Sequence, residues 1–100
     1  MAANNAAFSL GLVQKAGKAV SGDFAVREAL KGGKVKLLVI AADAAENTKK
    51  DLLYLAESAG VPVIEALSRV EIGAAIGKAP RASVAITDAN FVKMLTKNLK

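Results

Sequence analysis

The side chains with which this chain could do chemistry are carboxylates, lysines and arginines, because it contains neither histidine nor cysteine. Those two absences remove the commonest acid–base group at neutral pH, thiolate nucleophiles, disulfides and cysteine-based zinc sites. Glu65, Glu71 and Asp88 could be imagined as an acid–base pair, but nothing in their spacing brings two of them together. The sequence therefore predicts a protein that is not an enzyme and that carries no cofactor and no metal.

The run Lys31-Gly32-Gly33-Lys34 invites comparison with a phosphate-binding loop. A Walker loop spaces its glycines differently, ends in Lys-Ser or Lys-Thr, and lies between a strand and a helix. Here the two glycines follow a predicted helix and precede a predicted strand, and glycine is favoured just past the end of a helix. We therefore interpret the glycine pair as a helix end.

Positive charge is concentrated in one short segment. The net charge is +5, and residues 15–36 hold six basic and two acidic side chains, whereas residues 37–100 hold eight and seven. The six are Lys15, Lys18, Arg27, Lys31, Lys34 and Lys36. A local surplus of four positive charges is typical of a protein that binds a polyanion. The alternative is a solvated surface that aids solubility.

The start of the second predicted helix, Ser21–Asp23, suits a phosphate group. Gly22 allows a close approach of the backbone, and a helix N-terminus presents unpaired N–H groups to an anion. When the apolar face of this helix meets the core, Phe24, Arg27 and Lys31 point outward together. Phe24 could then stack on a nucleic-acid base. Its alternative role is a contact with a neighbouring loop or with the first helix.

Hydrophobic periodicity alternates between helical and extended stretches, which predicts one α/β domain over residues 1–100 with helices on both faces of a sheet. Helices are predicted over residues 4–16, 22–31, 44–59, 68–75 and from Thr87 or Asp88 onward, and strands over residues 19–21, 35–42, 61–64 and 82–86. Ser68 and Glu71 have the spacing of a capping box.

The predicted core follows from the same pattern. The apolar run within residues 35–42 indicates a strand buried on both faces. Core strand residues are expected to be Leu38, Ile40, Val63, Val84 and Ile86. Inward helix residues are expected to be Phe8, Leu12 and Val13, then Leu52, Leu55, Ala56 and Ala59, and lastly Val70, Ala74 and Ala75.

The N-terminal residues 1–14 carry no charged side chain, so the basic region of a secretory signal is missing. The most apolar stretch, residues 37–45, contains Asp43 and is too short to span a bilayer. We expect a cytoplasmic, monomeric protein without membrane contact.

A series of short motifs occurs in order along the chain: Leu10-Gly11-Leu12, Lys15-Ala16-Gly17-Lys18, Val20-Ser21-Gly22, residues 34–44, residues 46–50, Val61-Pro62-Val63, Leu67-Ser68-Arg69 with Ile72-Gly73, Ile76-Gly77-Lys78, and residues 84–88. This ordered set resembles the kink-turn-binding ribosomal protein family, of the L-seven-Ae and L-thirty-e type, and its small stand-alone bacterial members in particular. Together the motifs span about residues 8–96, nearly the whole chain.

The resemblance implies a three-layer αβα sandwich with a four-stranded mixed sheet, and RNA as the partner. The start of the second helix would enter the major groove beside sheared G·A pairs, and the loop over residues 65–69 would pack on flipped-out nucleotides. The implied RNA-binding residues are Lys18, Ser21, Gly22, Asp23, Phe24, Arg27, Lys31, Lys34, Glu65, Ala66, Leu67, Ser68 and Arg69. The RNA would be ribosomal or otherwise structured, with association to the ribosome as one form of this function.

The sequence departs from the family at the base-reading position. Well-studied members carry an Asn-Glu pair two and three residues after the glycine, where this chain has Phe24 and Ala25. We therefore expect binding of kinked RNA with little discrimination of sheared G·A pairs. The alternative function is a protein-interaction module that uses the same fold without RNA.

Overall fold

Four strands form one mixed sheet in a computed structural model that describes residues 2–99, with side chains over residues 6–97. The strands are β1 (Ala19–Ser21), β2 (Leu37–Ile40), β3 (Val63–Glu65) and β4 (Ser83–Ile86), in the order β1-β4-β2-β3. β2 pairs in parallel with β3, and β4 pairs antiparallel with both β2 and β1. Each predicted strand is present, and β2 and β4 are shorter than the apolar runs that predicted them.

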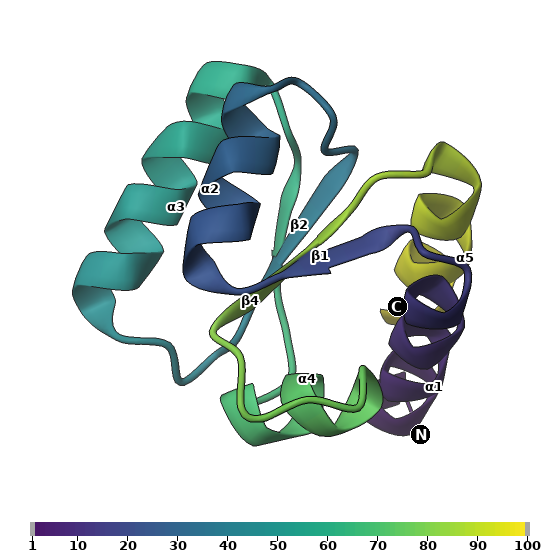
Figure 1. The fold of residues 1–100 in the computed structure, drawn as a ribbon. Coiled ribbons are helices and arrows are strands. Elements are labelled where there is room, and N and C mark those ends of the chain that lie inside the picture. Colours follow the sequence, from purple (N-terminus) through teal and green to yellow (C-terminus); the bar gives the residue numbers. More distant parts are fainter. Residues whose placement is uncertain (1, 100) are drawn as a thin grey trace.

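Helices cover both faces of the sheet (Figure 1). α2 (Asp23–Lys31) and α3 (Glu46–Ala59) lie on one face, and α1 (Ala2–Lys15), α4 (Arg69–Ala75) and α5 (Ala89–Leu99) lie on the other. This arrangement confirms the predicted αβα sandwich with a four-stranded mixed sheet. Within residues 2–99 no helix combines the length and the apolar character that crossing a membrane requires.

The two inner strands make the centre of the core. Every residue of β2 and β4 is buried, which confirms the prediction for Leu38, Ile40, Val84 and Ile86. Val63 is half-buried and packs against the core cluster, so its prediction as a core residue is confirmed only in part. The reason is topological, because β3 is an edge strand and the run Val61-Pro62-Val63-Ile64 does not reveal which strand lies at the edge.

Local signals at the helix ends are confirmed. The Ser68 side chain accepts the Glu71 N–H at 3.1 Å, and Glu71 in turn accepts the Ser68 N–H at 2.8 Å, which completes the capping box. Asp88 accepts the N–H of Asn90 at 2.8 Å at the start of α5. Gly60 ends α3 in the left-handed conformation, with φ 71°.

The inner face of α1 differs from the predicted one. Phe8 is 70% exposed and Leu12 is 37% exposed, so only Val13 of the predicted trio is buried. The buried residues of this helix include Ala6, Leu10 and Val13, which follow the i, i+4, i+7 spacing. The prediction chose the large side chains Phe8 and Leu12, whereas the buried stripe of α1 includes the small side chain of Ala6.

Two other helices also correct the prediction. In α4, Val70 and Ala74 are exposed, Ala75 is half-buried, and Ile72 and Gly73 face inward. A Cβ on Gly73 would lie 2.4 Å from the carbonyl oxygen of Ala79, so α4 packs too closely on the following loop for any side chain there. In α3, Leu52 and Ala56 are buried as predicted, whereas Leu55 is half-buried and Ala59 is exposed.

Ile40→Ala should lower the free energy of unfolding by about 2–5 kcal/mol, because the Ile40 side chain is 1% exposed and its removal leaves a cavity. Val70→Ala, at a position that is 64% exposed, should change it by no more than about 0.5 kcal/mol. Urea denaturation followed by circular dichroism compares the two variants with the parent. Equal unfolding midpoints for both variants would contradict the burial of β2.

Candidate nucleic-acid interface

Three strands end and the fourth begins at one edge of the sheet. The register pairs Ile40 with Glu65 on β3 and with Ser83 on β4, while Ser21 of β1 pairs with Val84. The connections that leave or enter these strand ends therefore gather on one side of the molecule (Figure 1). We call this surface the loop edge; it comprises residues 21–24, 41–45, 65–69 and 78–82.

Gly22 opens α2 at the loop edge in a conformation that other L residues rarely adopt, with φ 96° and ψ 136°. No side chain caps the first turn of this helix, so the backbone donors and the positive end of the helix dipole face outward. Phe24 stands in that first turn and is 77% exposed. Its predicted outward orientation is confirmed, and the alternative of a contact with a neighbouring loop or with α1 is wrong.

The loops that follow β2 and β3 are joined to each other. The N–H of Ala42 donates to the carbonyl oxygen of Leu67 at 2.8 Å, and Leu67 holds a positive φ of 63°. Lys49, from the first turn of α3, donates to the carbonyl oxygen of Ala42 at 2.8 Å and to the Glu65 carboxylate at 3.0 Å. These bonds hold the 65–69 loop in one shape, including the left-handed residue that would otherwise be strained.

The loop edge continues through Arg69 to the segment before β4. The Arg69 N–H donates to Asp43 at 2.8 Å, and the Arg69 guanidinium lies 3.8 Å from the same carboxylate. The Arg81 N–H donates to the Arg69 carbonyl oxygen at 3.1 Å. These contacts join the backbone just before β4 to the first residue of α4.

Arg81 is a candidate site residue that the sequence analysis did not select. Among the described side chains, its Nε is buried and has no hydrogen-bond partner. Its Nη1 lies 3.4 Å from the carbonyl oxygens of Ala79 and Pro80, which are long contacts. The Arg81 side chain as a whole is only half-buried, so the remaining N–H groups of its guanidinium, and not the enclosed Nε, are the ones that a phosphate oxygen could reach. No local pattern marks Arg81, because its surroundings come from α4 and from the loop.

Arg27 is already engaged by carboxylates. Its Nε lies 2.8 Å from Asp23 and its Nη2 lies 3.5 Å from Asp51 on α3. The hydrogen bond to Asp23 is the main cause of a pKa of Arg27 above its ordinary value, and the charges of both carboxylates add to it. Lys31 lies 3.8 Å from Glu28. Any phosphate that binds along α2 must therefore compete with these carboxylates.

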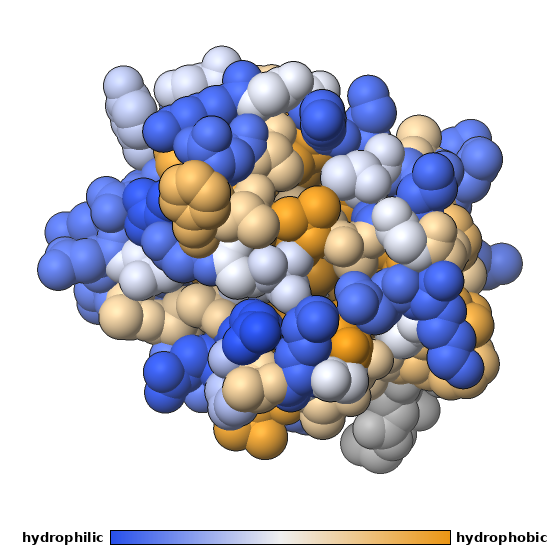
Figure 2. Space-filling view, viewed as in Figure 1, coloured by the Kyte–Doolittle hydropathy of each residue, from blue (hydrophilic) through white to orange (hydrophobic). Residues whose placement is uncertain are grey.

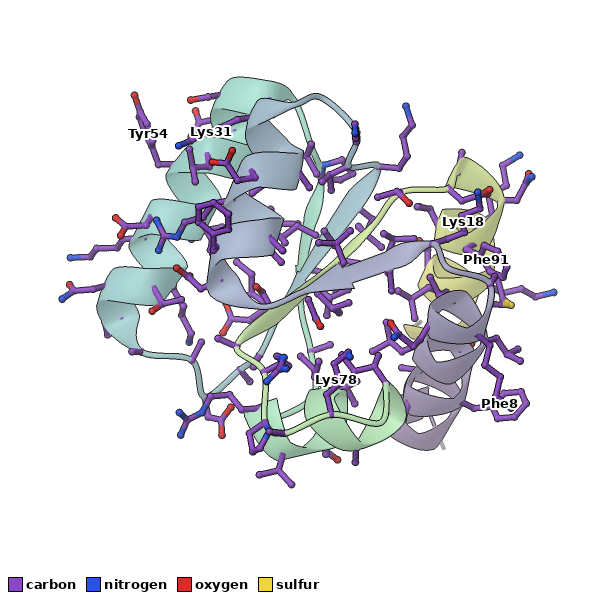
Figure 3. The ribbon with its side chains drawn as sticks, viewed as in Figure 1. Phe8, Lys18, Lys31, Tyr54, Lys78 and Phe91 are labelled. Atoms are coloured by element: carbon purple, nitrogen blue, oxygen red, sulfur yellow. The ribbon has the colours of Figure 1, made fainter. Side chains whose placement is uncertain are left out.

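The structure brings together some of the predicted site residues and separates others. Residues 21–24 and residues 65–69 lie at the loop edge, and Arg27 follows one turn along α2. Lys31 lies in the last turn of that helix. Lys18 and Lys34 precede β1 and β2 and therefore lie at the opposite edge of the sheet, away from the loop edge. Figure 3 shows Lys18 and Lys31 far apart on different layers.

The fold and the loop edge define an αβα-sandwich protein whose candidate binding surface is made from strand ends. Residues 5–96 match the model of the ribosomal protein L7Ae/L30e/S12e/Gadd45 family, and the chain belongs to that family. It is 36% identical over 86 residues to the RNA-binding protein YlxQ of Bacillus subtilis, covering 86% of each chain. It is 38% identical over 90 residues to the YlxQ protein of Enterococcus faecium, covering 90% of this chain and 85% of that one.

Solved structures show the same architecture. A Bacillus halodurans protein of unknown function superposes with a TM-score of 0.88 at 33% identity, covering 94% of this chain and 95% of that one. A 15.5 kDa RNA-binding protein of Giardia lamblia superposes with a TM-score of 0.80 at 19% identity, covering 98% and 84%. The second likeness concerns the fold alone.

Gly22→Ala should destabilise the protein by about 1–3 kcal/mol, because a Cβ disfavours the backbone conformation at φ 96° even though no atom lies within 4 Å of it. Gly32→Ala is the matched control, since Gly32 has φ −79° and its added Cβ would make an ordinary 3.4 Å contact. Thermal unfolding of both variants measures the difference. If both variants unfold like the parent, the start of α2 does not depend on glycine.

Proposed function

We propose that this protein binds kinked, structured RNA at the loop edge, and that its function is binding and not catalysis. The observation that carries the proposal is the meeting of the uncapped start of α2 with the braced 65–69 loop at one edge of the sheet. The family, and relatives that are themselves named RNA-binding proteins, support it. Within the described residues, no group of three acidic side chains comes together as a metal site would require.

The physical chemistry of RNA explains why these two elements belong together. The major groove of an A-form helix is too narrow and deep for side chains to read, so proteins recognise bends and splayed nucleotides. The α2 N-terminus offers backbone donors to phosphates at a bend. The 65–69 loop offers Ala66 and Leu67 as apolar contacts for bases that leave the stack. Arg69, at the end of this loop, and Arg81, which is hydrogen-bonded to it, would contact phosphates of the RNA backbone.

Phe24 determines how this site would contact RNA bases. A phenyl ring can stack on any base, which favours RNA binding without base-edge recognition. Ala25, which is also exposed, can neither donate to nor accept from a base edge. We infer that the protein selects the shape of a kink and tolerates changes in its base pairs.

The same proposal includes a cytoplasmic location, a monomeric state and association with the ribosome through ribosomal RNA. Ribosomal RNA supplies kinked helices of the kind that the loop edge would fit. Sedimentation of cell extracts at low and high salt tests the association, because contacts with phosphates weaken as salt rises.

Arg27→Gln and Arg81→Gln should each weaken binding to a kinked RNA by about tenfold, because each removes a charge-assisted contact with a phosphate. Each should also lower the log–log salt slope by about one, from a parent value that reflects roughly 3–5 phosphate contacts. Lys97→Gln is the control, with the same loss of charge on α5. Fluorescence anisotropy at several salt concentrations gives both quantities. Equal effects of all three changes would mean that no defined site exists at the loop edge.

Phe24→Asn combined with Ala25→Glu should increase the preference for a kink-turn RNA over the same RNA with its sheared G·A pairs replaced. An amide and a carboxylate can pair with base edges, and one such bidentate contact is worth about 1–3 kcal/mol in DNA readout. Titrating the parent and the double variant against both RNAs at one salt concentration measures the change. A parent protein that already prefers the intact kink-turn several hundredfold would show that the polar pair is dispensable here.

A further inference from the structure

The outer surface of the α1–α5 pair exposes apolar side chains. Phe8 is 70% exposed and Leu12 is 37% exposed, and their i, i+4 spacing places them on one face of α1. Phe91 of α5 is half-buried. Figure 3 shows Phe8 and Phe91 on the same side of the molecule. Hydrophobic and hydrophilic groups are interspersed along that side in Figure 2.

The charge of this surface has one sign. α1, the 16–18 link and α5 contain no acidic residue, and they carry Lys15, Lys18, Lys93 and Lys97. All four lysines are exposed, and none takes part in an ion pair among the described side chains. On the other layer, α2 and α3 together hold five acidic and four basic residues, and Arg27 and Lys31 are paired.

We propose that the α1–α5 surface docks a protein partner through an acidic amphipathic helix of that partner. Phe8 and Leu12 would be the apolar anchors of a helix-to-helix contact, and the lysines of α1, the 16–18 link and α5 would pair with glutamate and aspartate on the flanks of the incoming helix. Lys15 lies three residues from Leu12, on the same face of α1, which places a cation directly beside the apolar pair.

Other occupants fit the surface less well. A second copy of this chain would bring four unpaired lysines against four more, which is unfavourable. RNA would find the phosphate partners it needs, but Leu12 has no π-face for a base and no hydrogen-bonding group. A membrane-bound helix needs a broad apolar face, and among the described side chains of α1, residues 6–15, Phe8 and Leu12 are the only large apolar ones that are exposed.

The inference does not depend on the proposed RNA function. The α1–α5 surface lies on the opposite layer from α2, and its anchors are not part of the loop edge. RNA and the partner protein could therefore be bound at the same time. Failure of one proposal leaves the other intact, because each has its own residues and its own ligand.

The test uses the full chain and a synthetic helical peptide with leucines at every third and fourth position and glutamates elsewhere. Isothermal titration calorimetry should show binding that weakens with salt. Phe8→Ser should reduce the affinity by about tenfold or more, because the apolar burial of one aromatic side chain is lost. Tyr54→Ser is the matched control, since Tyr54 is also 70% exposed but lies on α3. It should leave the affinity unchanged.

Three comparisons separate the alternatives. A peptide with lysine in place of glutamate should not bind, and equal binding of both peptides would overturn the proposal. A loss of affinity for structured RNA in Phe8→Ser that exceeds the loss in Tyr54→Ser would assign the surface to RNA. Phe8-dependent binding to phosphatidylserine vesicles in preference to the acidic peptide would assign it to lipid. Absence of binding to the acidic peptide would also refute the proposal.

Discussion

The parallel pairing of β2 with β3 is the constraint on which the rest of this structure depends. Two parallel strands need a crossover, which α3 provides, and they must end at the same edge of the sheet. The antiparallel strand β4 then begins at that edge, and β1 ends there. The first turn of the crossover helix begins at this edge, directly after the 41–45 loop, and there Lys49 donates hydrogen bonds to the Ala42 carbonyl oxygen and to the Glu65 carboxylate. The loop edge is therefore a consequence of sheet topology.

Local sequence signals predicted the parts of the molecule that local physics determines. The capping box at Ser68, the outward direction of Phe24 and the complete burial of β2 each depend on neighbours in the sequence or on a strong apolar run. The incomplete burial of Val63 and the exposure of Phe8 could not be predicted in this way. Those positions depend on which strand becomes an edge and on which side of a helix its neighbours pack.

The candidate site also contains some residues that local sequence predicts and others that depend on tertiary packing. The 21–24 segment and the 65–69 loop could be predicted from motifs, but the importance of Arg81 could not, because only the tertiary packing buries its Nε. The basic segment over residues 15–36 also divides in space. α2 itself is neutral, with Asp23 and Glu28 against Arg27 and Lys31, and the remaining cations lie elsewhere. Charge density along a sequence is thus a poor guide to charge density on a surface.

The lysines of the α1–α5 layer give the molecule an electric dipole moment that runs across the sheet. The α2–α3 layer carries five acidic and four basic residues, whereas the opposite pair of helices and the 16–18 link carry four lysines and no acid. At an ionic strength of 0.01 M the screening length is about 30 Å, comparable with the longest molecular dimension of 31 Å. The field of a distant polyanion would then orient the protein so that the lysines of the α1–α5 surface point toward the polyanion. At physiological salt the screening length is about 8 Å, so the charges of one face have little effect on a ligand that binds at the other face.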